Sequence, residues 1–175
     1  RTKEKKERIR EYLEKHSDES GIIYCATRKN VDELYLFLES AGFSVGRYHA
    51  GMGNEARKSS QEDFIYDRIQ VMIATNAFGM GIDKSNVRYV LHYNMPQSLE
   101  NYYQEAGRAG RDSEPSECII YYSPQDVVIN QFLLESKENY GEYTAEEMQN
   151  IQVQDRERLQ KMTTYCTTTG CLRNY

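Results

Sequence analysis

One glutamine and two arginines near the middle of the chain are spaced so that they could hold a phosphate group. The sequence Gln-Glu-Ala-Gly-Arg-Ala-Gly-Arg-Asp occupies residues 104–112. If Ser98 caps a helix that runs through this segment, Gln104, Arg108 and Arg111 fall at i, i+4 and i+7 and share one face. Planar guanidinium groups pair well with phosphate oxygens, and an arginine aimed at a transferring γ-phosphate can raise the rate roughly 10³- to 10⁵-fold. The spacing therefore predicts a cationic phosphate site.

The same segment also fits an ordinary solvated helix end. Glu105 could pair with Arg108 three residues later, and Arg108 with Asp112 four residues later. Gly107 and Gly110 have no side chains, so they would let another backbone or a polyanion approach closely. Other segments of the sequence are needed to choose between a phosphate site and a solvated helix end.

Composition limits the classes of protein to consider. The chain has 175 residues, of which 39% are hydrophobic and 28% charged, which suits one ordinary domain with an appendage. It lacks a run of about 18 apolar residues, and its charged start is unlike a secretory signal, so we expect no membrane segment and an intracellular location. The net charge of -5 implies that any contact with nucleic acid is local.

Short apolar runs alternate with helical patterns, which predicts an α/β fold with a parallel sheet covered by helices on both faces. The predicted strands are residues 22–25, 45–49, 70–75, 88–93 and 118–122. The predicted helices are residues 3–16, 30–41 and 54–66, one that follows Ser98 and one that begins at Ser123. We therefore expect residues 1–136 to form one domain.

The composition of the sequence changes after residue 136. Residues 137–143 are polar and resemble a linker, and Thr144 with Glu147 forms a capping box that opens a long helix. The apolar residues of this helix are too sparse to bury themselves, so we expect it to pack on another element. Residues 137–175 are thus predicted to be a helical extension, and the end of the sequence at Tyr175 suggests an excised fragment.

The four cysteines fall into two kinds. Cys25 and Cys118 lie inside apolar runs, where a free cysteine behaves as a small hydrophobic residue, so we expect both in the core. Cys166 and Cys171 lie in a polar, threonine-rich stretch of the kind that collects metal ligands. Two cysteines alone cannot complete a four-ligand zinc site.

Polar loops follow three of the predicted strands. Thr27 and Arg28 follow the first, His49 the second, and the stretch from Thr75 to Asp83 the third. Because the carboxyl ends of parallel strands share one edge of a sheet, we expect these loops to meet there, where ligands bind in such folds. Each residue has a purely structural alternative: the threonines could cap or turn, His49 could be hydrogen-bonded internally, and Asp83 could close a turn.

Together these motifs resemble the second motor domain of superfamily 2 helicases, and within it the RecQ family of DNA helicases. The resemblance covers residues 21–126 and implies a RecA-like parallel sheet. Its motifs are Tyr-His-Ala-Gly at 48–51, Ala-Phe-Gly-Met-Gly-Ile-Asp-Lys at 77–84, Val-Arg-Tyr-Val-Leu-His-Tyr-Asn-Met-Pro at 87–96, and Tyr-Gln-Glu-Ala-Gly-Arg-Ala-Gly-Arg-Asp at 103–112.

The resemblance implies roles for residues around the nucleotide. Arg108 and Arg111 match the arginines that reach across a cleft to ATP bound by the preceding motor domain, with Arg111 as the first choice for the transition-state finger. Gln104 matches the polar residue at that cleft. Gly81 and Asp83 match the loop that links the state of the nucleotide to the grip on DNA.

The resemblance also implies contacts with DNA and zinc. Thr27, Arg28, His49 and Thr75 fall in motifs that hold the sugar-phosphate backbone of the tracked strand, so sequence-independent and salt-sensitive binding is expected. Cys171 resembles the first ligand of the RecQ zinc-binding module, whose other three cysteines would lie downstream. Cys166 matches no ligand clearly.

The implied function is the C-terminal motor domain of an ATP-dependent 3′ to 5′ DNA helicase. The implied location is cytoplasmic, at the bacterial nucleoid, or nuclear. Its partners would be the N-terminal motor domain of the same protein and DNA, as single strands and duplex junctions, with ATP, Mg²⁺ and Zn²⁺ as cofactors. The chain contains neither a Gly-x-x-x-x-Gly-Lys-Ser/Thr loop nor an acidic magnesium motif, so by itself it is expected not to hydrolyse ATP.

Three alternatives remain open from the sequence. The first is a motor of the same superfamily that acts on RNA. The second is a non-catalytic adaptor that binds nucleic acid. The third is a small-molecule α/β enzyme, for which the chain offers no nucleophile with a paired base and no dinucleotide-binding fingerprint.

Overall fold

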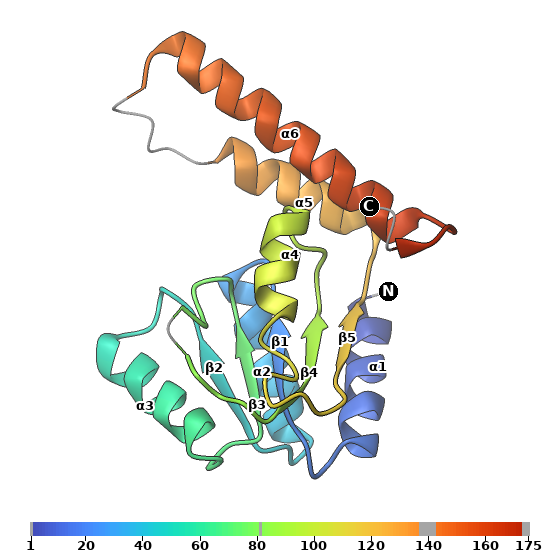
Figure 1. Ribbon diagram of the computed structural model, residues 1–175. Coiled ribbons are helices and arrows are strands. Elements are labelled where there is room, and N and C mark those ends of the chain that lie inside the picture. Colours follow the sequence, from blue (N-terminus) through green and yellow to red (C-terminus); the bar gives the residue numbers. More distant parts are fainter. Residues whose placement is uncertain (1, 81, 137–142, 173–175) are drawn as a thin grey trace.

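Parallel strands in the order β2-β3-β1-β4-β5 form the central sheet (Figure 1). The structure, a computed structural model, describes residues 2–80, 82–136 and 143–172. The strands are β1 (Ser20–Tyr24), β2 (Val45–Tyr48), β3 (Val71–Ala74), β4 (Val87–His92) and β5 (Glu117–Ile120). The helices are α1 (Thr2–Lys15), α2 (Arg28–Ser40), α3 (Asn54–Ile65), α4 (Leu99–Ala106), α5 (Pro124–Glu135) and α6 (Ala145–Thr167).

Both faces of the sheet are covered, as the sequence predicts. Side chains alternate along a strand, so Ile23 of β1 packs with the apolar stripes of α1 and α2, while Ile22 packs on the other face with α3. The segment between β3 and β4 contributes Phe78 and Ile82 to that second face. The predicted parallel α/β fold is confirmed.

The strand order creates a switch point beside β1. The chain leaves β1 for β2 on one side, returns to β3, and then crosses to β4 on the other side of β1. In open parallel sheets, ligands bind beyond the carboxyl ends of the strands at such a point. The edge at the ends of β1, β3 and β4 is therefore the first place to look for a site.

Helices α5 and α6 form an arm that packs on the end of α4 (Figure 1). Thr144 and Glu147 form the predicted capping box at the start of α6. Leu159 and Met162 of α6 are buried together with Met95, so the expectation that this helix packs on another element is confirmed. The division into two domains at residue 136 stays a prediction, and residues 137–142 of the predicted linker lie outside the described residues.

A buried carboxylate connects the arm to the sheet. Asp126 of α5 is 2% exposed and pairs with Lys5 of α1 at 3.0 Å. Its oxygens also accept hydrogen bonds from the side-chain amide of Asn94 and from the backbone N–H groups of Met95 and Ser123. Because a buried charge needs such partners, this cluster fixes α5 against α1 and the loop after β4.

The prediction for the cysteines in strands is half correct. Cys25 is buried, and burial raises the pKa of its thiol. Cys118 is exposed, so its predicted place in the core is wrong. It lies on β5, the edge strand, where the residues at the start of the strand face solvent. Among the described helices, none combines the length and apolar character that crossing a bilayer requires.

Candidate functional site

The helix that precedes the two arginines is shorter than predicted. It ends at Ala106, and residues beyond Gly107 form turns, so Gln104, Arg108 and Arg111 do not share a helical face. Gly110 has a φ of +66°, and its N–H donates to the carbonyl of Val87 at 2.9 Å. That bond to the start of β4 and the left-handed backbone together stop the helix.

The ion pairs of the solvated-helix alternative do not form either. Glu105 lies 2.6 Å from the Nε2 atom of buried His92, and Asp112 pairs with Arg88. The carboxylates of Glu105 and Asp112 therefore pair with residues of β4 and not with the two arginines. Arg108 and Arg111 keep their charge available at this surface.

Backbone oxygen atoms hold Arg111 in place. Its Nη1 atom donates to the carbonyl of Ile82 at 3.2 Å, and its Nε atom lies 3.5 Å from the carbonyl of Gly107. Asp83 is 3.9 Å away and is 94% exposed, so this ion pair is weak. The Arg111 side chain is 41% exposed. Its guanidinium is therefore oriented by the protein while part of its hydrogen-bonding surface remains open.

Arg108 is more enclosed and lies over a glycine. A Cβ atom on Gly79 would sit 2.4 Å from the central carbon of the Arg108 guanidinium, and Gly79 itself has a φ of +111°. The Nε atom of Arg108 is buried and has no hydrogen-bond partner among the described residues. Because Gly79 has no side chain, Arg108 can lie against it. This contact joins the predicted motif at 77–84 to the one at 103–112. Gly81, another predicted site residue, lies outside the described residues.

The turn after Arg111 contains a strained residue. Ser113 has a φ of +67°, a conformation that costs a residue with a Cβ about 1 kcal/mol or more relative to glycine. We expect Ser113→Gly to raise the free energy of unfolding by up to about 1 kcal/mol. Urea unfolding of both proteins measures the difference, and a destabilised variant would contradict the assignment of strain.

Three of the predicted loops meet at the carboxyl edge of the sheet. The register aligns Tyr24 and Tyr48 with Ala74, so the loops after β1, β2 and β3 lie side by side. They carry the four residues predicted to contact DNA, which are Thr27, Arg28, His49 and Thr75. Their shared position at this edge is as expected, and their role in binding DNA stays a prediction.

The four residues at this edge differ in what they present to solvent. Arg28 is exposed at the start of α2, where the helix dipole favours an anion, and Thr27 caps that helix by accepting from the N–H of Asn30. Thr75 is 8% exposed, and its backbone N–H donates to the carbonyl of Tyr48. Arg28 is therefore the residue at this edge best suited to meet a phosphate directly.

His49 has an internal structural role. Its Nδ1 atom accepts from the N–H of Gly51 at 3.1 Å, so the proton is on Nε2, which donates to Asp32 at 3.0 Å. The imidazole is 6% exposed. His49 thus shapes the loop after β2 through both ring nitrogens, which favours the internally hydrogen-bonded alternative.

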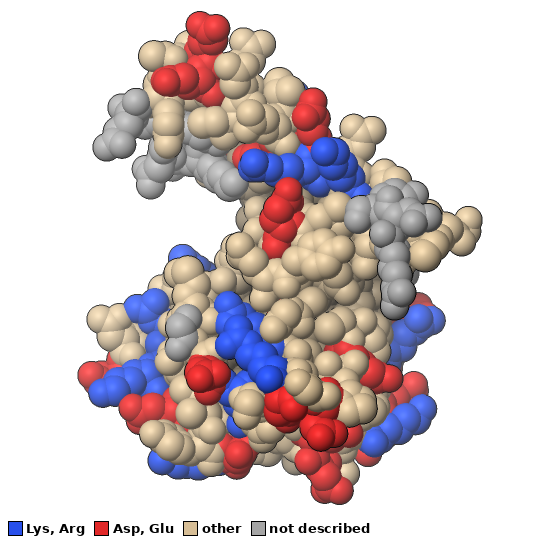
Figure 2. Space-filling view, in the orientation of Figure 1, with Lys and Arg blue, Asp and Glu red and all other residues tan. Residues whose placement is uncertain are grey.

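The arginines and Asp83 lie over the face of the sheet and not at its carboxyl edge, which corrects the expectation of one shared edge. Lys84 pairs with Asp67 in the turn before β3, and Gly110 bonds to Val87 at the start of β4. The segment from Phe78 to Lys84 therefore runs back across the sheet. Figure 2 shows basic side chains in the middle of this face and acidic ones gathered below them.

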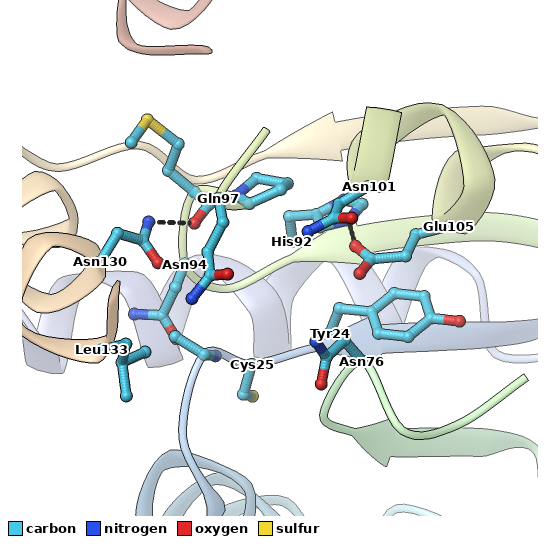
Figure 3. Close-up of a pocket in the computed structure, with 13 residues that line it drawn as sticks. Tyr24, Cys25, Asn76, His92, Asn94, Gln97, Asn101, Glu105, Asn130 and Leu133 are labelled. Carbon is cyan, nitrogen blue, oxygen red and sulfur yellow. Dashed lines mark hydrogen bonds and ion pairs between the residues drawn. The ribbon is translucent and has the colours of Figure 1, made fainter. Parts of the chain in front are cut away.

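A small polar pocket lies beyond the carboxyl ends of β1 and β4, at the switch point of the sheet (Figure 3). It is lined by Tyr24, Cys25, Asn76, His92, Asn94, Gln97, Asn101, Glu105, Asn130 and Leu133, among others. Sequence reasoning did not identify these residues as a site. The one available signal was His92, a titratable residue that follows apolar Val90 and Leu91 at the end of β4.

The described residues do not fit a zinc site by themselves. They contain no group of three or more His, Cys, Asp and Glu side chains that could hold a metal ion. Cys171 is exposed beyond α6, and burial raises the pKa of Cys166 to about 11, which disfavours the thiolate that zinc requires. Zinc binding by Cys171 stays a prediction that needs ligands beyond the described part.

Comparison with solved structures finds proteins of similar fold. Dbp5 of Saccharomyces cerevisiae, solved with RNA and ADP BeF3, matches with a TM-score of 0.65 at 23% identity, over 91% of this chain and 43% of that one. The Escherichia coli DEAD-box protein SrmB matches with a TM-score of 0.64 at 23% identity, over 74% of this chain and 76% of that one. At this identity the likeness establishes the RecA-like fold.

Sequence comparison is more specific. The ATP-dependent DNA helicase RecQ of Bacillus subtilis is 48% identical over 95% of this chain and 27% of its own length. The Haemophilus influenzae RecQ is 46% identical over 75% of this chain and 22% of its own length. The RecQ-like DNA helicase blm-1 of Caenorhabditis elegans is 50% identical over 62% of this chain and 11% of its own length.

The chain thus spans about a quarter of the length of the B. subtilis relative. The family model for the helicase conserved C-terminal domain matches residues 4–113, which include the loops at the carboxyl edge and both arginines. The chain therefore belongs to the helicase conserved C-terminal domain family and is homologous to the RecQ-type DNA helicases.

Proposed function

We propose that this chain is the C-terminal motor domain of an ATP-dependent DNA helicase that moves 3′ to 5′ along one strand. The observation that carries the proposal is the Arg111 guanidinium, which two backbone carbonyls orient while it stays open to solvent. A chain without a phosphate-binding loop needs such an arginine only if a nucleotide is held by a neighbour. The identity with RecQ proteins supports DNA as the substrate.

In this proposal ATP and Mg²⁺ are bound mainly by the preceding motor domain of the same protein. Mg²⁺ would supply charge neutralisation at the phosphates. Arg111 would meet the charge that develops on the γ-phosphoryl group, and Arg108 would assist it. Gln104, which is exposed on α4, would supply a polar group at the same cleft. Asp83, held loosely near Arg111, would respond to closure of the cleft because its carboxylate is free to change partners.

DNA would cross the carboxyl edge of the sheet. Arg28, at the start of α2, offers a cation and a helix N-terminus to a backbone phosphate. Phosphate contacts carry no base information, so binding should be independent of sequence and sensitive to salt. Zinc bound by Cys171 and an intracellular site of action on DNA complete the proposal.

Arg28→Ala should weaken single-strand binding of the complete protein equally for different sequences and lower the salt dependence of log K by about 1. Fluorescence anisotropy at several salt concentrations measures both effects. Arg8→Ala is the matched control, because Arg8 is exposed on α1 and pairs only locally with Glu4. An unchanged salt dependence in Arg28→Ala would remove this residue from the DNA path.

ATP hydrolysis by the complete protein tests the proposed function. DNA strands should stimulate turnover more than RNA strands of the same sequence, and a duplex with a 3′ overhang should be unwound in preference to one with a 5′ overhang. Stronger stimulation by RNA would support a motor that acts on RNA. Nucleic-acid binding without any stimulated hydrolysis would support an adaptor.

A further inference from the structure

Tyr24 of β1 is buried on the face of the sheet that Phe78 and Ile82 cover. Its ring is 3% exposed and stacks on His92 of β4, with ring centroids 5.5 Å apart. Its hydroxyl group lies 3.3 Å from the carbonyl of Phe78 and donates to it. Phe78 immediately precedes Gly79, which accommodates Arg108. A tyrosine in the centre of the sheet thus reaches the segment that carries the arginine contact.

Arg108 lies next to the backbone that Tyr24 holds. A Cβ atom on Gly79, the residue after Phe78, would sit 2.4 Å from the central carbon of the Arg108 guanidinium, so this guanidinium lies directly against the backbone of Gly79. Burial raises the pKa of Tyr24, and the positive charge of Arg108 opposes that rise. The hydroxyl group of Tyr24 therefore supports Arg108 through the backbone at Phe78 and Gly79.

The same backbone segment therefore holds both arginines. The hydroxyl group of Tyr24 holds the carbonyl of Phe78 beside Gly79, against which Arg108 lies, and the carbonyl of Ile82 accepts from Arg111. The enclosed Nε atom of Arg108 leaves its terminal nitrogens as the groups able to turn outward. Small displacements of a group that must align with a reacting phosphate can cost about 10²-fold in rate.

We propose that Tyr24 is a positioning residue for the reaction at the nucleotide, whose hydroxyl group holds the backbone at Phe78 and Gly79 and thereby orients the Arg108 guanidinium from inside the domain. The proposal rests on the proposed function, because it assigns an internal support to the arginines of that site. Tyr24 is buried and acts through Arg108. Loss of its hydroxyl should therefore affect catalysis after ATP is bound.

The test compares two tyrosine variants of the complete protein. Tyr24→Phe keeps the buried ring and should lower kcat for DNA-stimulated ATP hydrolysis about 10-fold, while the KM for ATP and the affinity for DNA stay within about twofold. Tyr89→Phe is the matched control. Tyr89 is a buried tyrosine on the opposite face of the sheet, and its hydroxyl has no hydrogen-bond partner among the described residues, so kcat should not change. Equal kcat in Tyr24→Phe and wild type would overturn the proposal.

A double-mutant cycle identifies the partner. In an Arg108→Lys background, Tyr24→Phe should have little further effect on kcat, because the guanidinium that it orients is gone. If the effects of the two substitutions on kcat simply multiply, Tyr24 acts independently of Arg108, and the proposal is overturned.

A second measurement needs no variant at Tyr24. In the wild-type protein, the Nε–H group of Arg108 should exchange its hydrogen with solvent slowly, as expected for a buried and oriented side chain. Its NMR signal is assigned as the one that is lost in Arg108→Lys. Fast exchange would overturn the proposal even if Tyr24→Phe did not fold. Full activity of an Arg111→Ala variant would instead count against the proposed function, so the two failures can be told apart.

Discussion

Replacing Arg111 by alanine is expected to lower the kcat of DNA-stimulated ATP hydrolysis by about 10³-fold or more in the complete protein. Arg111 offers an oriented guanidinium to solvent, and its present partners are backbone carbonyls and one weakly held carboxylate. None of these contacts explains an arginine here as a stabilising ion pair. Its removal should therefore act on the transition state, while affinity for single-stranded DNA stays unchanged.

Two further variants separate charge from geometry. Arg111→Lys keeps the charge but loses the planar fork that matches phosphate oxygens, so it should recover only part of the lost turnover. Arg68→Ala removes an exposed arginine that pairs with Asp63 before β3, and its kcat should equal that of wild type. Unchanged turnover in Arg111→Ala would remove the transition-state role from this residue.

The largest expected effect on stability comes from Asp126→Ala. This change leaves Lys5, whose side chain is 13% exposed, without its carboxylate partner, and it leaves the N–H groups of Met95 and Ser123 without an acceptor. Removing one partner of a buried ion pair costs about 3 to 5 kcal/mol. Urea unfolding followed by circular dichroism should show a loss of this size.

The control for this variant is Asp63→Ala. Asp63 is partly exposed and pairs with Arg68 at the surface, where such pairs contribute about 0 to 1 kcal/mol. If Asp126→Ala cost no more than Asp63→Ala, the carboxylate of Asp126 would not be what holds α5 and the loop after β4 together. A larger loss would confirm that the arm depends on this buried charge.

Local sequence patterns predicted the elements of the fold well because each depends on neighbours in the chain. A short apolar run marks β1, and Thr144 marks the start of α6 through a capping box that spans four residues. The order of the strands is a long-range property that such patterns do not contain. Cys118 shows the consequence, since its apolar surroundings looked like a core strand and β5 proved to be an edge strand.

The candidate site shows the same limit. The residue types at 104–112 predict a phosphate site. The two glycines indicate that a helix through this segment is costly, and the observed helix indeed ends at Ala106, earlier than the predicted one. Its end depends on the bond from Gly110 to Val87, which lie 23 positions apart. The contacts of Tyr24 and His92 could not be predicted for a related reason. Both residues belong to strands that are far from the arginines in sequence.

Binding of ADP with aluminium fluoride, which imitates the transferring phosphoryl group, tests most directly whether this domain supplies the arginine of a nucleotide site that it shares with a neighbour. In the complete protein with DNA and Mg²⁺, Arg111→Ala should bind ADP alone as tightly as wild type does and should bind the complex with aluminium fluoride far more weakly. Equal affinity of both proteins for that complex would contradict the role of Arg111 at the γ-phosphate.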